Sequence, residues 1–352
     1  MIKLRNLDFR LPSGFALNID SLEIREGEVF AVIGPNGAGK TTLLNILALL
    51  QEAKPGALEI GGSDALAPSS RTRLRRSMAY LFSRPYLVND TVYSNVELPL
   101  RFRGERDSGQ VAEMLEVFKI GYLRDRNATQ LSQGERHRVS MARAFVTRPR
   151  LVLLDEPFSS LDARAKEAII GDLRRITRAA KTTVVLVTQD QEEALALADV
   201  LAVIKGGRLL QQGKPQEIFA RPASKEVADF VGVETLLDGE VKAKSDNLCS
   251  VSVGPATLEV ASECAVGDKV LLCVRPEAVS VSKAPEANSM RNHFRGKIVS
   301  MEPWRLEYRL SVDCGFNLIA AVTKRSLDEM GLKPGDEVFA SFKATAAHLI
   351  RR

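Results

Sequence analysis

The chain has 352 residues, of which 45% are hydrophobic and 26% are charged, proportions that are ordinary for a globular protein. This length exceeds what a single hydrophobic core typically supports, so we expect two domains. The 49 Lys and Arg residues against 44 Asp and Glu give a net charge of +5, too mild an excess to indicate a broad nucleic-acid-binding surface.

One dense basic cluster stands out from this background: Arg71, Arg73, Arg75, Arg76 and Arg84. Such a cluster could face phospholipid headgroups or nucleic acid, and a solvated helix face explains it equally well. We expect no nucleic acid partner.

The cysteines and the apolar runs bear on the compartment. No C-x-x-C pair occurs among the cysteines, which predicts neither a zinc site nor a disulfide framework and fits a reducing cytosol. The N-terminus reads directly into strand-like residues, so no signal peptide is expected. Apolar runs such as 43–50 are far shorter than a membrane span, so association with a membrane is expected to go through a partner.

Residues 1 to about 33 predict short strands, with turn signals at Pro12-Ser-Gly14 and Glu26-Gly27. Phe15 or Phe9 could lie against an adenine ring, or either could be a core aromatic. The last of these strands, Val29 to Ile33, leads into the most informative stretch of the chain.

That stretch has the spacing GxxxxGK[ST] between an apolar strand and an apolar helix, the order that a phosphate-binding loop requires. Its glycines let the backbone N–H groups turn inward toward an anion, and the following helix directs its positive end there. Lys40 adds a charge, and the Thr41 hydroxyl can reach a Mg²⁺ ion. The plainer alternative is a glycine-rich turn between core elements. The predicted phosphate-binding residues are Gly34, Pro35, Asn36, Gly37, Ala38, Gly39, Lys40, Thr41 and Thr42.

Further along, residues 55–60 and 78–82 predict strands, and the helical spacing of residues from about 85 to 147 predicts a mostly helical insertion. Within it, Ser132 and Glu135 have the spacing of a capping box before an apolar helix. The plain interpretation is a well-capped helix start. The functional one is an anion site at that helix terminus, with Gly134 allowing close approach.

A hydrophobic strand, Leu151 to Leu154, ends in the acidic pair Asp155 and Glu156. Acidic residues at the end of a buried strand are costly unless a cation lies there. In a phosphate-loop protein that cation is Mg²⁺, held by Asp155. Glu156 points elsewhere and can polarise a water molecule. Another buried strand covers 183–188, and a hairpin over 201–210 turns at Gly206-Gly207.

The order GPNGAGKT, LSQGE, LLDEP and Ser160-Leu161-Asp162 resembles the nucleotide-binding subunits of ABC transporters over residues 1–235. The resemblance implies an ATPase that works as a head-to-tail homodimer. Each ATP would lie between one chain's phosphate loop and the other chain's Ser132, Gln133 and Gly134. Asp155 would be the Walker B aspartate and Glu156 the catalytic base.

Two positions depart from the family pattern. A glutamine that usually reaches the metal is replaced by Ser83, and a histidine that usually acts in catalysis is replaced by Gln189. A bridging water can make up for the shorter serine, and the Gln189 amide can still hydrogen-bond the γ-phosphate but cannot carry a proton. We therefore expect ATP hydrolysis at a reduced rate.

Residues 236–352 predict many short strands with Gly and Pro turns, the signature of a small β-barrel or sandwich. VGDKVLLCVRPEAV, from Val266, and PGDEVFASFKATAA, from Pro334, indicate an internal repeat. An upstream pair, Gly239-Glu-Val and Gly296-Lys-Ile, has the same pattern at a shorter offset, as an extra segment in the second copy would produce. We predict two related β-units.

This tail resembles the oligonucleotide-fold-like (TOBE) regulatory domain of importer ATPases, and more narrowly the small molybdate- and tungstate-binding (Mop) module. A tetrahedral oxyanion needs hydroxyls, backbone N–H groups and a cation. The resemblance suggests Ser289, Arg291, Asn292 and Lys343 as its ligands, although Met290 departs from the usual small residue. Alternatively, Arg291 and Lys343 are surface cations and Ser289 is a turn residue.

The predicted fold is thus an α/β P-loop ATPase domain (1–235), with a mixed sheet and a helical subdomain, followed by a small all-β domain (236–352). The predicted function is the ATP- and Mg²⁺-dependent subunit of a prokaryotic importer, for molybdate or tungstate. It would lie peripherally on the cytoplasmic face of the membrane with transmembrane permease subunits, and be served indirectly by an external binding protein. The alternatives are a sulfate, polyamine, sugar or ferric-ion importer, a weak ATPase acting as an oxyanion sensor, and a soluble ABC ATPase acting on DNA or ribosomes.

Overall fold

The computed structural model describes residues 1–159, 161–285 and 289–352. Its contacts divide the chain into two compact units, Met1–Ile218 and Phe219–Arg352. This division falls before the predicted boundary at 235/236. Arg275 accounts for the difference, because its guanidinium donates hydrogen bonds to the carbonyls of Phe219 and Val231, at 3.0 Å each. The segment that carries these carbonyls is thereby held to the β-rich tail.

The first unit is built on one mixed sheet, in the order β5-β4-β1-β2-β10-β9-β3-β8-β7-β6. Strands β9, β3, β8, β7 and β6 are parallel, whereas β1 pairs antiparallel with β2 and β4. The strands are β1 (Ile2–Arg10), β2 (Ala16–Ile24), β3 (Val29–Ile33), β4 (Leu58–Ile60), β5 (Ser63–Asp64), β6 (Met78–Leu81), β7 (Leu151–Asp155), β8 (Thr183–Thr188), β9 (Val200–Lys205) and β10 (Arg208–Gly213). The mixed sheet that the sequence predicts is confirmed.

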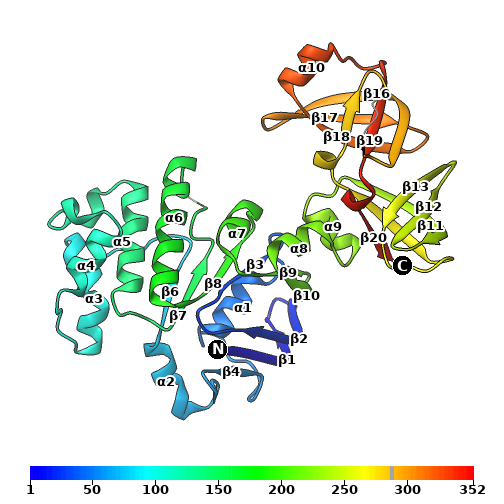
Figure 1. The fold of residues 1–352 in the computed structure, drawn as a ribbon. Helices are drawn as coiled ribbons and strands as arrows, with labels where there is room; N and C mark the ends of the chain where they lie inside the picture. The colour runs from blue at the N-terminus through cyan, green and yellow to red at the C-terminus, as the bar shows by residue number, and fades with distance from the viewer. Residues whose placement is uncertain (160, 286–288) are drawn as a thin grey trace. The chain divides into compact units, whose positions relative to one another are not determined.

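The helices of this unit are α1 (Lys40–Leu47), α2 (Pro68–Arg76), α3 (Val92–Arg103), α4 (Gln110–Val117), α5 (Gln133–Phe145), α6 (Ala163–Ala180) and α7 (Gln191–Leu197), with 3₁₀ turns at Gly121–Leu123 and Ala128–Gln130. Helices α3, α4 and α5 form a block between β6 and β7 in the chain, which confirms the predicted helical insertion (Figure 1). α5 contacts α3, α4 and β6, so the block packs on itself and on the edge strand of the sheet.

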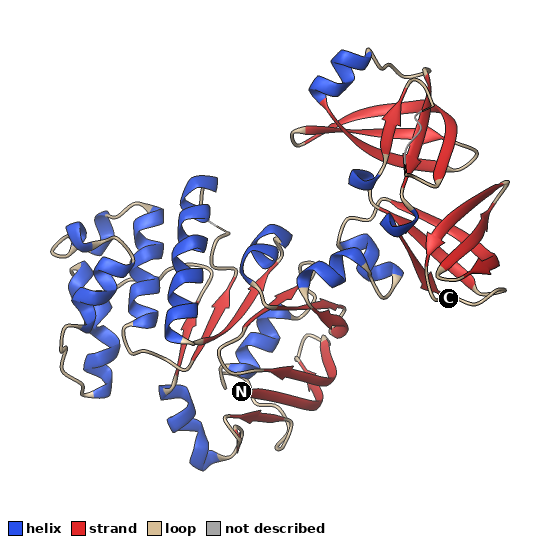
Figure 2. Cartoon of the chain, in the orientation of Figure 1, coloured by secondary structure: helices blue, strands red, loops and turns tan. Residues whose placement is uncertain are grey.

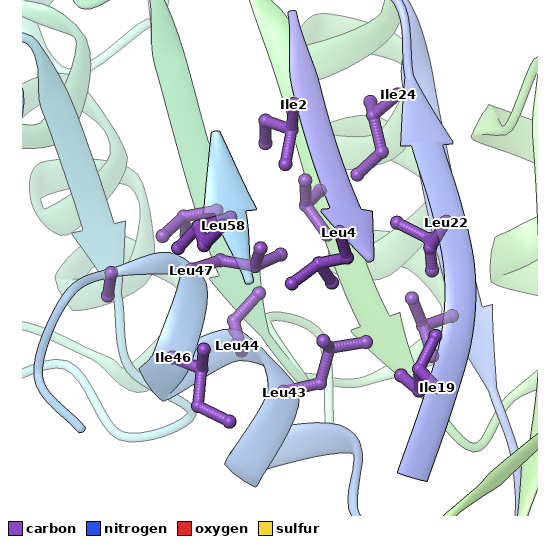
Figure 3. Packing of buried hydrophobic residues seen from close by; sticks show 14 of the residues in the cluster. Ile2, Leu4, Ile19, Leu22, Ile24, Leu43, Leu44, Ile46, Leu47 and Leu58 are labelled. Carbon is purple, nitrogen blue, oxygen red and sulfur yellow. The ribbon is translucent and has the colours of Figure 1, made fainter. Parts of the chain in front are cut away.

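The core of the first unit lies between α1 and the sheet. Leucines of α1 lie against isoleucines and leucines of β1, β2 and β4, and all of those labelled in Figure 3 are at most 2% exposed. Burying each such side chain contributes about 1.5–3 kcal/mol. This packing fixes α1, and therefore the loop that precedes it, against the central strand β3.

The second unit consists mostly of strands (Figure 2). Its elements are α9 (Lys225–Phe230), β11 (Thr235–Ser245), β12 (Leu248–Val253), β13 (Ala256–Ala261), β14 (Lys269–Val274), β15 (Ser280–Ser282), β16 (Asn292–Trp304), β17 (Glu307–Asp313), β18 (Asn317–Thr323), α10 (Lys324–Met330), β19 (Glu337–Phe342) and β20 (Ala347–Arg351), with 3₁₀ turns at Pro276–Ala278 and Ala344–Ala346; α8 (Pro215–Ala220) spans the junction of the two units. They form two five-stranded antiparallel sheets, β13-β12-β11-β14-β20 and β15-β19-β16-β17-β18.

The two sheets confirm the predicted repeat, down to individual hydrogen bonds. Gly267 and Gly335 both have positive φ, of 92° and 95°, and donate 2.8 Å hydrogen bonds to Val241 and Ile298 respectively. The first long strand of each copy has a register shift just after Val241 or Ile298. Helix α10 is the extra segment of the second copy.

The copies exchange their last strands. By its place in the repeat, β15 corresponds to β20, yet β15 pairs with β19 of the second copy and β20 pairs with β14 of the first. Each sheet is therefore completed by a strand from the other copy, and the two copies lie within one compact unit.

Candidate functional site

The predicted phosphate loop is held by two glycines that contact their surroundings closely. A Cβ atom on Gly34 would lie 2.0 Å from the Ile204 carbonyl oxygen on β9, and one on Gly39 would lie 2.8 Å from the Phe15 ring. Gly39 also has a φ of 103°, which favours glycine. It is the N-cap of α1 and has no side chain that could accept a hydrogen bond from the first turn of the helix. The first N–H groups of α1 are therefore left for an anion. Phe15 packs against the loop, as an adenine-stacking residue or a core residue would.

Lys40 is held inside this loop. Its side chain is 6% exposed, and its ammonium donates to the carbonyls of Gly34, at 2.8 Å, and Pro35, at 3.1 Å. Burial lowers the pKa of Lys40, and the carboxylates of Glu156 and Asp155 partly offset this effect. A desolvated ammonium held over the loop by two carbonyl oxygens is well placed to bind a phosphate oxygen.

Asp155 lies at the end of β7, with its carboxylate between two hydroxyl donors. Thr41 donates to Oδ1 at 3.1 Å and Tyr80 donates to Oδ2 at 3.4 Å. Burial raises the pKa of Asp155, while the hydrogen bonds from Thr41 and Tyr80 and the charge of Lys40 act against this. A buried carboxylate beside a threonine hydroxyl is an oxygen donor set that fits Mg²⁺. Asp155 and Thr41 would hold the ion together with phosphate oxygens.

Tyr80 is a residue of the site that sequence reasoning missed. Its single O–H hydrogen lies between two acceptors, Asn45 Oδ1 on α1 at 3.1 Å and Asp155 Oδ2 at 3.4 Å. Burial, followed by the charge of Asp155, raises the pKa of the phenol, so the hydroxyl stays protonated and can serve as a donor. The signal available in the sequence was a tyrosine in a buried strand, whose hydroxyl must find a partner.

Glu156 follows Asp155 but is turned away from it by the backbone. Its φ of 43° lies in the left-handed region, which is uncommon for glutamate, and its N–H donates to the Val187 carbonyl at 2.8 Å. The side chain is 25% exposed, with Oε1 4.0 Å from the Lys40 ammonium. The local backbone strain thus places a second carboxylate beside the phosphate loop, within reach of solvent.

Gln189 and Ser83 follow the ends of two other strands at the same edge of the sheet. Gln189 comes directly after Thr188, which is paired with Ile33, the residue before Gly34. Its side chain is exposed and makes no hydrogen bond with the described part of the chain. Ser83 is half-buried, two residues beyond β6, the neighbour of β7. Their roles toward phosphate and metal remain predictions.

The segment Ser132-Gln133-Gly134 forms the start of α5. Ser132 Oγ accepts a hydrogen bond from the Glu135 N–H at 3.4 Å, and Glu135 accepts one from the Ser132 N–H at 2.8 Å, which confirms the capping box. The hydrogen bond from the Ser132 hydroxyl is the main cause that lowers the pKa of Glu135. Ser132 and Gln133 are exposed, as residues that meet a nucleotide on another chain must be. Ser160, the first residue of the predicted Ser160-Leu161-Asp162 motif, lies outside the described residues.

Three of the predicted oxyanion ligands of the tail, Arg291, Asn292 and Lys343, lie at one end of the β16–β19 pair. Asn292 pairs with Phe342, which brings Arg291 beside Lys343. Arg291 already forms an ion pair with Glu259, at 3.3 Å, whereas Ser289 and Lys343 are exposed. Asn292 is 1% exposed, and both ends of its amide are bonded to Glu259: the oxygen accepts from the Glu259 N–H and the nitrogen donates to the Glu259 carbonyl, at 2.8 Å each. Oxyanion binding by these four residues remains a prediction.

We expect Asn292→Ala to lower the free energy of unfolding of the protein by about 1–3 kcal/mol, because it leaves two partly buried backbone groups of Glu259 without their partner. Urea unfolding followed by circular dichroism measures this effect. Lys343→Ala, at an exposed neighbouring position, serves as the control and is expected to change stability by less than about 0.5 kcal/mol. Equal stability of Asn292→Ala and the wild type would show that this tie contributes nothing.

Comparisons with known proteins support the two-part organisation. The family model described as "ABC transporter" matches residues 17–159, and the model described as "TOBE domain" matches residues 288–349. Two solved structures resemble the chain: cbiO1 from Clostridium perfringens, part of the ABC transporter complex cbiONQ (TM-score 0.58, 26% identity, 66% of this chain and 94% of that one), and the ATP-binding cassette MJ0796 as a post-hydrolysis dimer with ADP and Pi (TM-score 0.55, 29% identity, 61% and 99%).

Relatives that match almost the whole chain have different cargoes in their names. The "Molybdate/tungstate import ATP-binding protein WtpC" of Pyrococcus horikoshii is 34% identical over 99% of each chain. The "Spermidine/putrescine import ATP-binding protein PotA" of Pseudomonas aeruginosa is 32% identical over 100% of this chain and 99% of that protein. The "Sulfate/thiosulfate import ATP-binding protein CysA" of Thermosynechococcus vestitus is 32% identical over 96% and 95%. Together with the phosphate loop and acidic pair described above, these matches show that the chain belongs to the ABC importer ATP-binding proteins, a family of ATP hydrolases.

Proposed function

We propose that this chain hydrolyses ATP to energise the import of molybdate or tungstate. The observation that carries the catalytic part is the meeting of Lys40, Asp155 and Glu156 at one edge of the sheet. Lys40 and the loop N–H groups bind the phosphates, Asp155 and Thr41 hold Mg²⁺, and Glu156 takes the proton from the attacking water. The Gln189 amide and a water on Ser83 complete the set around the γ-phosphate.

Two copies of the chain would complete the site, with Ser132, Gln133 and Gly134 of one copy meeting the nucleotide on the other. The exposed start of α5 supports this arrangement. Closure on ATP and reopening after hydrolysis would then supply the movement that drives transport.

Transmembrane permease subunits are the proposed partners of this movement. No helix in the described ranges is long and apolar enough to span a membrane. A groove of about 320 Å³ between β6, α3 and α5 is lined by Tyr80, Leu98 and Phe102, and Phe102 is 79% exposed. A helix of the permease docked in this groove would hold the chain at the cytoplasmic face of the membrane, while an external binding protein delivers the cargo to the permease.

The arginine cluster has structural partners, which favours the absence of a nucleic acid ligand. Arg71 is paired with Glu52 and donates to the Leu49 carbonyl, and Arg75 donates to the same carbonyl. These two guanidinium groups tie α2 to the end of α1. The cluster is thus in part a set of internal supports rather than a continuous surface for phosphates.

The cargo rests on the likeness to the molybdate/tungstate relative and on the hydroxyl and cation set near Arg291 and Lys343. Polyamine or sulfate import is the competing assignment, because relatives named for those solutes are nearly as similar. A weak ATPase that mainly senses an oxyanion is a second alternative, favoured by Ser83 and Gln189 in place of the usual residues.

Isothermal titration of the full-length chain separates these cargoes. We expect heat from molybdate and tungstate, none from spermidine, and a weaker response in Lys343→Gln, because removing the cation weakens the charge-assisted hydrogen bonds to a dianion. Lys54→Gln, an exposed lysine of the ATPase unit, is the matched control. Heat from sulfate or spermidine alone would overturn the molybdate and tungstate assignment.

A further inference from the structure

A closed ring of interactions includes Thr188 and Asp190, the residues on either side of Gln189, but not the Gln189 side chain. The Lys166 ammonium, on α6, contacts the carboxylates of Asp190 and of Glu193, the latter at 2.8 Å. The other oxygen of Glu193 accepts a hydrogen bond from the Thr188 hydroxyl at 2.5 Å. Thr188 Oγ1 in turn accepts from the Asp190 N–H at 3.0 Å, which closes the ring.

The ring is buried on the side that faces α6 and α7. The side chain of Glu193 is 4% exposed and that of Lys166 is 22% exposed. Burial raises the pKa of Glu193, and the hydrogen bonds from Lys166 and Thr188 counteract it. Burial opposes the charge on Lys166 as well, but the two carboxylates outweigh it and raise the pKa of the ammonium. Each charge in the ring therefore depends on its partner, because an unpaired charge at this depth is costly.

The residues on both sides of Gln189 are fixed by this ring and by the sheet. Thr188 is the last residue of β8 and pairs with Ile33 of β3, next to the phosphate loop. Asp190 is the N-cap of α7, where its Oδ1 accepts from the Glu192 N–H at 2.8 Å. Only the Gln189 side chain, among the three residues of this turn, is left exposed and without a hydrogen bond to the described chain.

We propose that Lys166 is a positioning residue for hydrolysis, which holds the Thr188–Asp190 turn so that the Gln189 amide faces the γ-phosphate. This inference rests on the proposed role of Gln189. Glutamine has more side-chain freedom than histidine, so a fixed backbone on both sides reduces the ordering that each catalytic cycle requires.

The position of Lys166 also links this turn to the start of α6. Asp162 is the N-cap of α6, and the Lys166 N–H donates to its carbonyl at 2.9 Å. Lys166 therefore lies on the first turns of the helix that follows the Glu156 segment. The Lys166 ammonium thus connects that helix start to Asp190, the residue after Gln189.

The test compares steady-state ATP hydrolysis by the purified full-length chain and its variants, with MgATP as the varied substrate. We expect Lys166→Met to lower kcat about tenfold or more, because small misplacements of a catalytic group have effects of this order. KM for ATP should change by less than about twofold, since the phosphate loop is intact. Lys166→Arg should restore most of kcat, and Lys54→Met, which removes an exposed ion pair with Asp8, should match the wild type.

A double-mutant cycle separates positioning from a general structural role. If Lys166 acts through Gln189, Lys166→Met should cost little further kcat in a Gln189→Ala background. An additive loss in the double mutant, an unchanged kcat in Lys166→Met, or no effect of Gln189→Ala alone would each overturn the inference. Failure of the proposed function would give a different result in the same assay. The wild type and Glu156→Gln would then hydrolyse ATP at the same rate, or neither would hydrolyse it.

Discussion

Glu156→Gln should lower kcat for ATP hydrolysis by about 10²–10⁴-fold, the range over which a positioned general base contributes. The structure supports this because the left-handed φ of Glu156 turns its carboxylate away from Asp155 and toward the phosphate loop. The amide has the same shape but cannot accept the proton from water. Phosphate release from the purified chain measures the effect.

The same variant should still bind ATP, because Lys40 and the loop N–H groups are unchanged. Equilibrium binding of a fluorescent ATP analogue provides this control, and we expect an affinity within about threefold of the wild type. Hydrolysis that survives in Glu156→Gln would remove Glu156 as the base. Loss of binding together with hydrolysis would show instead that the carboxylate supports the loop.

Gly34→Ala should strongly destabilise the first unit and abolish ATP binding. Its Cβ would lie 2.0 Å from the backbone oxygen of Ile204, so either the loop or β9 must move. Overpacking of this kind costs about 1–3 kcal/mol when flexible side chains can adapt, and a backbone oxygen adapts less readily. Thermal unfolding and ATP binding measure the two effects.

Gly37→Ala is the matched comparison, because a Cβ there would have no atom within 4 Å and the cost comes from its φ of 76° alone. We expect a loss of about 1–2 kcal/mol, typical of placing alanine in the left-handed region. If Gly34→Ala is as stable as the wild type, the close approach of the loop to β9 is wrong.

The parts of the site that sequence reasoning predicted are those encoded locally. The phosphate loop is one continuous stretch, and Asp155 and Glu156 follow a strand whose hydrophobicity marks it as buried. The capping box of Ser132 and Glu135 is likewise read from a three-residue spacing. In each case, one short segment contains both the element and the functional residue.

The parts that were missed depend on partners far apart in the chain. Tyr80 and Asp155 are separated by 75 positions, and their hydrogen bond follows from the pairing of β6 with β7, which neither strand reveals alone. The ring around Gln189 joins α6 to α7 across 24 positions between Lys166 and Asp190. Spacing within a helix cannot predict such contacts.

The tail gives a similar lesson for topology. Its repeat was visible in the aligned Gly267 and Gly335, but the exchange of β15 and β20 between the copies was not. Each last strand follows a 3₁₀ turn at the same place in its copy, Pro276–Ala278 before β15 and Ala344–Ala346 before β20, and neither short segment reveals which sheet it joins. The pairing of β15 with β19 and of β20 with β14 is therefore a property of the whole tail that local sequence does not predict.

The most direct test of the proposed import is cellular accumulation of molybdenum and tungsten, measured by elemental mass spectrometry in a strain that lacks the gene for this chain. We expect accumulation to fall on deletion, to return with the wild-type chain and to stay low with Glu156→Gln. Unchanged accumulation of both metals, together with lost uptake of sulfate or spermidine, would contradict the assignment of the cargo.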